Sequence, residues 1–304
     1  MDEPGGGVTP GARLRARIDS GPILVVPGAY DALFGSLVQR AGFEAVYLTG
    51  SGVSYSTLAA PDIGLVTADT MAAKVRELSG VVDVPIIADG DTGYGDEANI
   101  ARTVREYERG GAAAIQIEDQ LSPKRCGHYA GKQVVEVEEM VARLHAALGA
   151  RRDPGFMVIA RTDAATVIGF DAALERASAY ADAGADMIFV EAPASREELA
   201  AVPRAVGVPA MANIVEGGRT PIVPAAELEQ MGYRLVIYPN AITRTVARAA
   251  MELLATLRRD GSTLAHLDRM LTFAQLTDLV GGQRWVSDLA ASSTPGSGAE
   301  MDVE

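Results

Sequence analysis

The stretch Asn99-Ile-Ala-Arg-Thr-Val-Arg-Glu-Tyr-Glu-Arg-Gly-Gly-Ala-Ala-Ala-Ile-Gln-Ile-Glu118 contains one complete helix–strand unit. Its first part mixes apolar and charged residues in the pattern of an amphipathic helix. Two glycines follow, at the point where a helix has to end before the next element begins. The last part is a short apolar run, which is typical of a strand buried on both faces of a parallel sheet.

The same unit recurs from one end of the chain to the other. The apolar runs expected to be strands are residues 23–27, 45–49, 85–89, 113–118, 156–161, 186–191, 208–213 and 234–238. Eight such units without a break in composition predict an α/β fold, a closed (β/α)₈ TIM-type barrel. A doubly wound open sheet is the alternative, although no Gly-x-Gly-x-x-Gly follows the first strand.

The two ends of the chain depart from this pattern. The expected organisation is a flexible N-terminal arm (1–20), a catalytic barrel (21–262), C-terminal helices (263–286) and a disordered tail (287–304). Phe273, Leu276, Leu279, Val280 and Trp285 form an apolar stripe on the C-terminal helices. Since eight units already complete a barrel, this stripe is expected to pack on a partner subunit or on the barrel itself.

Composition excludes several classes of protein. The chain has 27 Lys and Arg against 40 Asp and Glu, a net charge of −13, which disfavours nucleic acid as a partner. No apolar stretch has the length of a membrane span, and the N-terminus lacks the features of a secretory signal, so no membrane association is expected. A single cysteine excludes an internal disulfide framework, which favours the cytoplasm.

That single cysteine, Cys126, has neighbours that favour the reactive thiolate form. Lys124 and Arg125 precede it and His128 follows it, and each positive charge would stabilise the thiolate. A lone cysteine is usually an inert small hydrophobe. Here the surrounding segment is polar and contains glycine and proline, which predicts a mobile loop with a reactive sulfur.

Acidic residues collect where the predicted strands end. In a barrel these carboxyl ends surround the active site. Asp89 and Asp91 end the third strand and Glu118 ends the fourth, and three carboxylates so close together would repel unless a cation neutralised them. Oxygen ligands with water at the remaining positions indicate Mg²⁺ or Mn²⁺. Zinc is disfavoured because the three histidines are scattered, and His145 and His266 are interpreted as structural.

Two further strand ends carry groups that can bind an anion. The turn Tyr47-Leu-Thr-Gly-Ser-Gly52 offers backbone N–H groups and hydroxyls to a carboxylate or phosphate. Arg161 interrupts an apolar strand, so it either pairs with Glu191 on the neighbouring strand or clamps a substrate carboxylate. The two roles are compatible.

Together these motifs resemble the isocitrate lyase/phosphoenolpyruvate mutase superfamily from about residue 22 to residue 285. The motifs are Pro27-Gly-Ala-Tyr-Asp31, Leu48-Thr-Gly-Ser-Gly52, Pro61-Asp-Ile-Gly64, Asp89-Gly-Asp-Thr-Gly-Tyr-Gly95, Ile117-Glu-Asp-Gln120, Lys124-Arg-Cys-Gly-His128, Ala160-Arg-Thr-Asp163 and Ala212-Asn-Ile-Val-Glu-Gly-Gly218. The cysteine motif is typical of the lyase branch, and the chain looks similar to 2,3-dimethylmalate lyases, methylisocitrate lyases and the petal-death type of oxaloacetate hydrolase. Oxaloacetate hydrolases usually carry a serine where this chain has Pro239.

The resemblance implies a role for each candidate residue. Mg²⁺ would bind Asp89, with help from Asp91 and Glu118 partly through water. The 2-oxo acid portion of the substrate would lie on Thr49, Gly50 and Ser51 near Asp62, in a pocket completed by Arg161, Glu191 and Asn213. The 120–132 loop would close over this pocket. The superfamily commonly exchanges its terminal helices between paired subunits, which implies a homo-oligomer, specifically a tetramer.

The implied activity is Mg²⁺-dependent cleavage of a carbon–carbon bond. A 2-hydroxy dicarboxylate or tricarboxylate, of the alkylmalate or methylisocitrate kind, would give a 2-oxo acid such as pyruvate and a carboxylic acid. Cys126 would carry the proton, His128 would tune the thiol, Tyr47 would act on the hydroxyl, and Arg161 would offset carboxylate charge. The alternatives are an oxaloacetate hydrolase, a carboxyphosphonoenolpyruvate phosphonomutase, and a catalytically silent barrel that only binds a metabolite.

Overall fold

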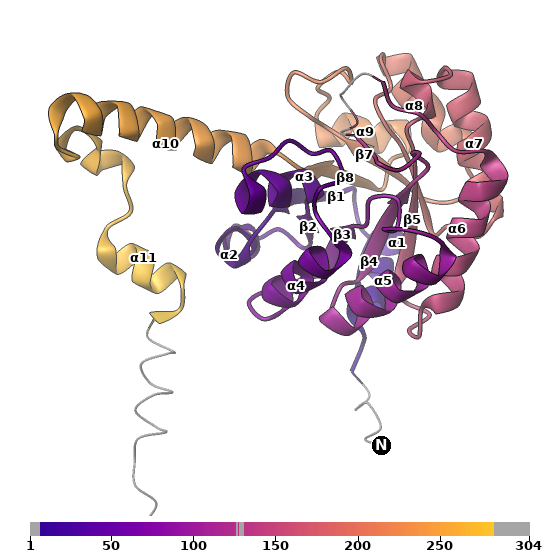
Figure 1. Ribbon diagram of the computed structural model, residues 1–304, viewed down its shortest axis with the longest axis horizontal. Helices are drawn as coiled ribbons and strands as arrows, with labels where there is room; N and C mark the ends of the chain where they lie inside the picture. The colour runs from indigo at the N-terminus through magenta and orange to yellow at the C-terminus, as the bar shows by residue number, and fades with distance from the viewer. Residues whose placement is uncertain (1–6, 126, 128–130, 283–304) are drawn as a thin grey trace, which may run out of the picture. The chain divides into compact units, whose positions relative to one another are not determined.

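The structure, a computed structural model, describes residues 7–125, 127 and 131–282, and its central feature is a closed barrel of parallel strands (Figure 1). Each strand pairs with the next along the chain, and β8 pairs with β1 through Leu235 and Leu24. The strands are β1 (Leu24–Ala29), β2 (Val46–Leu48), β3 (Ile86–Asp89), β4 (Ala114–Glu118), β5 (Met157–Thr162), β6 (Met187–Val190), β7 (Ala210–Asn213) and β8 (Leu235–Tyr238). Every one overlaps a predicted apolar run. The TIM-type barrel is confirmed, and the open sheet is excluded by the β1–β8 pairing.

Helices follow the strands and surround the barrel (Figure 1). They are α2 (Ala32–Arg40), α4 (Ala68–Ser79), α5 (Glu97–Gly110), α6 (Val137–Ala150), α7 (Phe170–Asp182), α8 (Arg196–Ala205) and α9 (Ala225–Met231). Shorter helical turns, α3 (Gly50–Val53), η1 (Ser54–Leu58) and η2 (Ala164–Thr166), lie after β2 and β5. The extra turns therefore follow the carboxyl ends of two strands, where a barrel builds its site.

Helix α5 shows how the sequence sets one unit. Asp96 caps its N-terminus by accepting a hydrogen bond from the Asn99 N–H at 3.1 Å. Gly111 ends it with φ of 98°, a left-handed conformation that suits glycine. The buried Tyr107 on this helix donates from its hydroxyl to the Asp89 carbonyl at 3.0 Å. Packing of the helix thus also holds the end of β3.

Helix α1 (Pro10–Ser20) corrects the prediction of a flexible arm over residues 1–20. Thr9 caps the helix and Pro10 starts it. Leu14 and Ile18 are buried, and both belong to the apolar cluster formed by the inward-facing side chains of the barrel strands. The glycine and proline residues at the start of the chain led to the prediction of a flexible arm. The helix is stable because two of its apolar side chains pack in the barrel, and a local sequence pattern does not show this.

The chain divides into two compact units, residues 1–246 and 247–304, and the division falls within α10 (Ala241–Asp260). The second unit also contains η3 (Leu264–Arg269) and α11 (Phe273–Leu279). The buried His266 shares a hydrogen bond of 2.9 Å with Thr256, which agrees with the interpretation of this histidine as structural. His145, the other histidine so interpreted, lies exposed on α6.

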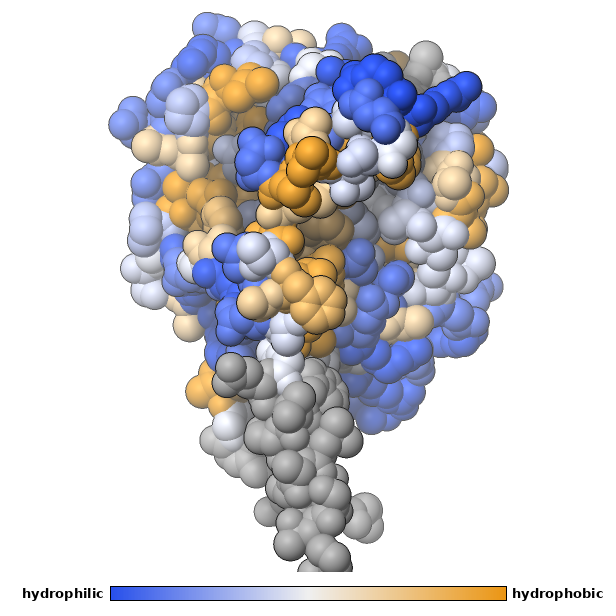
Figure 2. Space-filling model, turned by 90° about the vertical axis from the view of Figure 1, so that its left-hand side faces the viewer, coloured by the Kyte–Doolittle hydropathy of each residue, from blue (hydrophilic) through white to orange (hydrophobic). Residues whose placement is uncertain are grey.

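Large apolar side chains of the second unit remain at the surface. Phe273 is 88% exposed, and Leu276 and Val280 are about half exposed. Figure 2 shows hydrophobic residues among hydrophilic ones at the surface. Trp285 and the predicted tail at 287–304 lie outside the described residues. None of the helices in the described part of the chain is long and apolar enough to cross a membrane.

Candidate active site

A cavity lies at the carboxyl ends of the barrel strands. Its lining includes these predicted site residues: Tyr47, Thr49, Ser51, Asp62, Asp89, Arg161, Glu191 and Asn213. It also includes residues that the sequence did not single out as site residues, namely Gly127, Phe189, Val215, Ile237, Pro239 and Asn240. The barrel therefore brings strand ends from distant parts of the chain to one place, as predicted.

The turn after β2 forms one wall of the cavity. The Gly50 N–H donates to Asp89 Oδ2 at 3.3 Å, and the Thr49 and Ser51 hydroxyls lie 3.0 Å apart. Ser51 also donates to Asn240 Oδ1 at 3.0 Å, which ties this turn to the end of β8. A β-carbon on Gly50 would lie 2.8 Å from Asp89 Oδ2, so the close approach to that carboxylate requires glycine. The predicted turn is thus built directly against the predicted metal ligand.

Acidic side chains beside this wall share one ammonium group. Lys124 Nζ lies 2.6 Å from Asp62 Oδ1 and 2.7 Å from Asp91 Oδ1, and all three side chains are buried. Burial raises the pKa of Asp91 to about 7 although the Lys124 charge opposes the change, and the carboxylates of Asp89 and Asp62 raise it further. The acids therefore carry more negative charge than one ammonium group neutralises.

The predicted metal ligands, Asp89, Asp91 and Glu118, lie at the ends of the neighbouring strands β3 and β4. Within the described residues, no three His, Cys, Asp or Glu side chains are arranged as a metal-binding group. Glu118 Oε1 is nevertheless buried without a hydrogen-bond partner among those residues, and the Glu118 N–H donates to the Asp91 carbonyl at 2.9 Å, which keeps the two acids close. Hard oxygen donors, one of them unsatisfied, fit a hard divalent cation.

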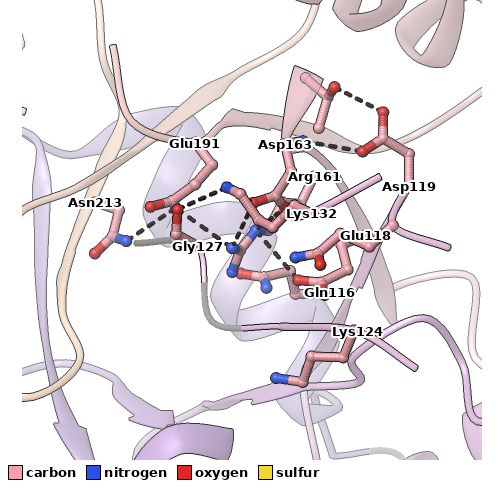
Figure 3. A network of polar contacts seen from close by, with 12 residues as sticks. Gln116, Glu118, Asp119, Lys124, Gly127, Lys132, Arg161, Asp163, Glu191 and Asn213 are labelled. Carbon is pink, nitrogen blue, oxygen red and sulfur yellow. Dashed lines mark hydrogen bonds and ion pairs between the residues drawn. The ribbon is translucent and has the colours of Figure 1, made fainter. Parts of the chain in front are cut away.

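Arg161 lies among three carboxylates, as Figure 3 shows. Its Nε is 2.9 Å from Asp163 Oδ2 and 3.3 Å from Glu118 Oε2, and its Nη2 is 3.7 Å from Glu191 Oε2. The predicted pair with Glu191 is present, but Asp163 is the nearer partner. Glu191 in turn accepts a hydrogen bond from Asn213 Nδ2 at 3.1 Å. The guanidinium also lines the cavity, so its ion pairs do not remove it from the site, and its role as a clamp for a substrate carboxylate stays a prediction.

Tyr47 is fully enclosed at the base of the cavity. Its hydroxyl donates to Gln116 Oε1 at 3.1 Å, and Gln116 is itself buried. Burial, with a smaller effect from the charge of Asp89, raises the pKa of Tyr47 well above its usual value. Tyr47 is therefore protonated and acts as a hydrogen-bond donor in this state.

The two acids at the end of β4 face opposite ways, because neighbouring side chains of a strand alternate. Glu118 lies beside Arg161 on the cavity side. Asp119 points to the helices and accepts hydrogen bonds from Thr162, Tyr180 and Arg176 at 2.7, 2.9 and 3.2 Å. Of these two neighbouring acids, only Glu118 faces the cavity.

Comparison with known proteins shows the family to which this chain belongs. The phosphoenolpyruvate phosphomutase family matches residues 14–258 of the chain. A 2,3-dimethylmalate lyase from Eubacterium barkeri is 46% identical over 270 residues, covering 89% of this chain and 93% of the relative. A 2-methylisocitrate lyase from Aeropyrum pernix is 44% identical over 272 residues, covering 90% of this chain and 87% of the relative. The chain belongs to the isocitrate lyase/phosphoenolpyruvate mutase superfamily.

Solved structures of the superfamily match over nearly the whole chain. A crystal structure of 2,3-dimethylmalate lyase has a TM-score of 0.90 at 37% identity, covering 98% of this chain and all of the other. The structure of oxaloacetate acetylhydrolase with the inhibitor 3,3-difluorooxalacetate has a TM-score of 0.90 at 34% identity, and the match covers 97% of this chain and all of the other. Phosphonopyruvate hydrolase in complex with oxalate and Mg²⁺ has a TM-score of 0.84 at 31% identity, and the match covers 93% of this chain and 98% of the other.

Two of the predicted catalytic residues of this superfamily member, Cys126 and His128, lie outside the described residues. The segment around them is anchored at described positions. Gln120 bonds the Arg125 backbone through both ends of its amide, at 2.9 Å to the N–H and 2.8 Å to the carbonyl. Gln120 also forms a bridge with Val134. These contacts hold the two ends of the cysteine loop together at the rim of the barrel.

Sequence reasoning missed Lys132 and Asp163, and it gave Lys124 only a role in tuning the thiol. All three are buried. Lys132 and Asp163 belong to the ion-pair network of Figure 3, and Lys124 pairs with Asp62 and Asp91. Lysine is rare in this chain: it occurs at residues 74, 124 and 132 only, so two of the three lysines lie in the cysteine loop. The occurrence of two of the three lysines in one loop could have indicated their place in the site.

Proposed function

We propose that this chain is a Mg²⁺-dependent lyase that cleaves a 2-hydroxy dicarboxylate or tricarboxylate, of the alkylmalate or methylisocitrate kind, to a 2-oxo acid and a carboxylic acid. One observation carries the proposal: the guanidinium of Arg161, whose side chain is 11% exposed, shares a cavity with the turn at 49–51 and with Asp89. Such a cavity can hold one carboxylate on the turn and a second on the arginine. The similarity to 2,3-dimethylmalate and 2-methylisocitrate lyases supports the same substrate class.

In the proposed reaction the bond between C2 and C3 of the substrate breaks. The electron pair of that bond moves to C3, where the attached carboxylate stabilises it, while the 2-hydroxyl gives its proton to a general base, the role proposed for ionised Tyr47, and becomes the 2-oxo group. Cys126 then donates a proton to C3. Mg²⁺, held by Asp89 with Asp91 and Glu118, would supply the Lewis acidity that makes the alkoxide and the enolate-like product accessible.

The described residues have complementary roles in this proposal. The turn of Thr49, Gly50 and Ser51 orients the 2-oxo acid half, with Asp62 beside it, and Arg161 offsets the charge that builds up on the departing carboxylate. Glu191 and Asn213 hold each other and keep the guanidinium from turning away. The Tyr47 hydroxyl donates to Gln116 in this structure, so it would have to release Gln116 to donate to the substrate 2-oxygen, and it can serve as a base only where added positive charge lowers its pKa.

A hydrolase of oxaloacetate is the second candidate, since oxaloacetate acetylhydrolase has the same fold and a similar length. That reaction needs a water molecule placed against a carbonyl. Pro239 lines the cavity at the position where such hydrolases usually carry serine, and its side chain offers no hydroxyl to hold that water. This residue favours the lyase over the hydrolase. A phosphonomutase would use the same cavity, and a silent binding barrel would not require a thiol in the loop.

The substrate class is tested by product analysis. The protein is incubated with Mg²⁺ and, separately, with a set of 2-alkylmalates, methylisocitrate, oxaloacetate and carboxyphosphonoenolpyruvate, and the products are identified by mass spectrometry and ³¹P NMR. Pyruvate plus a carboxylic acid from an alkylmalate or methylisocitrate is the expected result. Oxalate plus acetate would show that the protein is a hydrolase instead. A new carbon–phosphorus signal would identify a mutase, and the absence of any product would identify the silent barrel.

We further propose a homo-oligomer, specifically a tetramer, in which the C-terminal helices pack on a neighbouring subunit. Met251, Leu254, Leu264 and Phe273 are each more than 60% exposed in the single chain. Burying a side chain of this size stabilises by about 1.5–3 kcal/mol, so leaving all of them in water is unfavourable. The single cysteine, which can form no internal disulfide, supports a cytoplasmic setting for this assembly.

Light scattering tests the oligomer. The full chain should have a mass of several subunits at micromolar concentration, where one chain is 31.8 kDa. Phe273→Asp, or deletion from Thr272 onward, should reduce that mass or cause aggregation. Val81→Asp is the control, because Val81 is also an exposed apolar residue but precedes β3 in the barrel unit. A stable full-length monomer would contradict the proposal.

A further inference from the structure

The carboxylate of Asp163 binds two cations at once. Its Oδ2 accepts from Arg161 Nε at 2.9 Å, and its Oδ1 accepts from Arg161 Nη2 at 3.2 Å and from Lys132 Nζ at 2.7 Å. The side chains of Asp163 and Lys132 are 0% and 2% exposed. Burial alone would raise the pKa of Asp163, but the charges of Arg161 and Lys132 outweigh it and lower the pKa to about 2. Asp163 is thus the charged centre of this part of the site.

Lys132 connects that centre to the cysteine loop. Besides its ion pair with Asp163, the ammonium group donates to the Gly127 carbonyl at 2.6 Å (Figure 3). Gly127 is the residue that follows Cys126 in the sequence. The backbone of the loop is therefore bonded, through one buried lysine, to the carboxylate that also holds Arg161.

Gly127 lies directly against the substrate-facing groups. A β-carbon at this position would lie 2.7 Å from Arg161 Nη2 and 2.8 Å from the Glu191 carboxylate, so there is no room for a side chain. Two contacts therefore locate the Gly127 peptide: the ammonium of Lys132 on its carbonyl, and the packing of its α-carbon on Arg161 and Glu191.

Asp163 is itself fixed by the barrel wall. Its N–H donates to Asp119 Oδ1 at 2.9 Å, and Asp119 is fully buried. The other oxygen of Asp119 is held by Thr162, by Tyr180 and by Arg176, the last two on α7. These hydrogen bonds fix Asp163 to the barrel wall and to α7.

We infer that Lys132 and Asp163 are positioning residues, through which the barrel wall sets the peptide of Gly127, the next residue in the sequence after Cys126, against Arg161. The inference rests on the proposed function, in which Cys126 and Arg161 act on one substrate. A buried ion pair is costly to desolvate and is often replaceable by apolar side chains without loss of stability. An apolar pair at these positions could not replace two contacts: the hydrogen bond from Lys132 to the Gly127 carbonyl, and the hold of the Asp163 carboxylate on the Arg161 guanidinium.

The experiment compares Lys132→Met with Lys74→Met, the same change at a lysine on α4 that pairs with Glu77 and does not line the cavity. We expect Lys132→Met to lower kcat about 100-fold, since misplacing a reacting group by about 1 Å costs about that factor. KM should change little, because Arg161 keeps both its bonds to Asp163. Asp163→Asn removes the charge that holds the guanidinium, so it should lower kcat and also raise KM about tenfold or more.

A second measurement does not depend on turnover. Cys126 is the only cysteine, so its alkylation by iodoacetamide in the presence of Mg²⁺ and oxalate reports on the loop alone. Lys132→Met should change this rate severalfold, Lys132→Arg should return it toward the wild-type value, and Lys74→Met should leave it unchanged. If Lys132→Met does not fold, Asp163→Asn and Lys132→Arg decide by the same two measurements.

Wild-type kcat and a wild-type alkylation rate in folded Lys132 and Asp163 variants would overturn the inference, even if their melting temperatures fall. In that case the ion pair only stabilises the fold. If the wild-type protein cleaves none of the substrates, the proposed function fails, while the alkylation rates still decide whether Lys132 holds the loop.

Discussion

Chelation of divalent metal should abolish turnover of this protein, and added Mg²⁺ or Mn²⁺ should restore it. Around the cavity four buried carboxylates, Asp62, Asp89, Asp91 and Glu118, share the single ammonium of Lys124 and the guanidinium of Arg161. A dianionic substrate entering this field would be repelled unless further positive charge accompanied it. Lewis-acid stabilisation of a reacting oxygen contributes several kcal/mol, so the loss should be about a thousandfold or more.

The variant that tests the same site is Asp89→Ala. Asp89 accepts hydrogen bonds from the N–H groups of Gly50 and Asp91, and it lines the cavity. We expect a loss comparable to that caused by the chelator, with circular dichroism and melting temperature close to those of the wild type. Asp83→Ala, a change at an exposed aspartate just before β3, is the control and should keep full activity.

Mn²⁺ binding followed by electron paramagnetic resonance separates the metal from the chemistry. The wild type and Asp83→Ala should bind one ion per chain with similar affinity, and Asp89→Ala should bind it much more weakly. Full turnover in excess chelator would rule out the metal site and, with it, the part of the proposed reaction that depends on Lewis acidity.

Cys126→Ser should remove carbon–carbon cleavage while leaving the binding of oxalate nearly intact. The substitution changes one atom, and a hydroxyl is a far weaker acid and base than a thiol near neutral pH. General acid–base catalysis contributes about 10²–10⁴-fold, so kcat should fall by that factor. Oxalate affinity, measured by calorimetry with Mg²⁺ present, should change little, because the turn at 49–51 and Arg161 are untouched.

The control for this variant is Ser122→Ala, an exposed position in the same loop. It should leave kcat unchanged and so show that the loop tolerates a small substitution. An unchanged kcat in Cys126→Ser would mean that the thiol does not carry the proton, and it would favour the hydrolase. Combining Cys126→Ser with Lys132→Met should add little further loss, because both changes act on one proton transfer.

The sequence alone was sufficient to predict the barrel and most of its cavity. Eight apolar runs separated by amphipathic stretches have few other ways to bury both faces of every strand. Once the strands are assigned, the topology carries their carboxyl ends to one rim, which is why Asp89, Arg161, Glu191 and Asn213 could be grouped although they are far apart in the chain. The periodicity of neighbouring residues contains all of that information.

Other features depended on contacts between distant segments. Helix α1 forms because Leu14 and Ile18 find apolar partners among the inward-facing barrel side chains, which no local pattern reveals. From the sequence, Glu118 and Asp119 are two equivalent acids at the end of one strand. In the structure their side chains point to opposite faces of the strand, so Glu118 lies beside Arg161 and Asp119 accepts a hydrogen bond from Arg176 on α7. Lys132 and Asp163 lie 31 residues apart, and their meeting depends on how the loop folds back on β5.

There is a physical reason why the sequence predicts the barrel but not the ion pairs. Which segments become strands and helices is set by the spacing of apolar side chains, a property that each stretch of sequence carries by itself. Which carboxylate pairs with which cation is set by distance and burial in the folded chain, because Coulomb energies and desolvation change steeply over a few ångströms. The sequence therefore determined the barrel and the chemical types at its rim, and only the tertiary structure decided the partners of Arg161, Lys124 and Lys132.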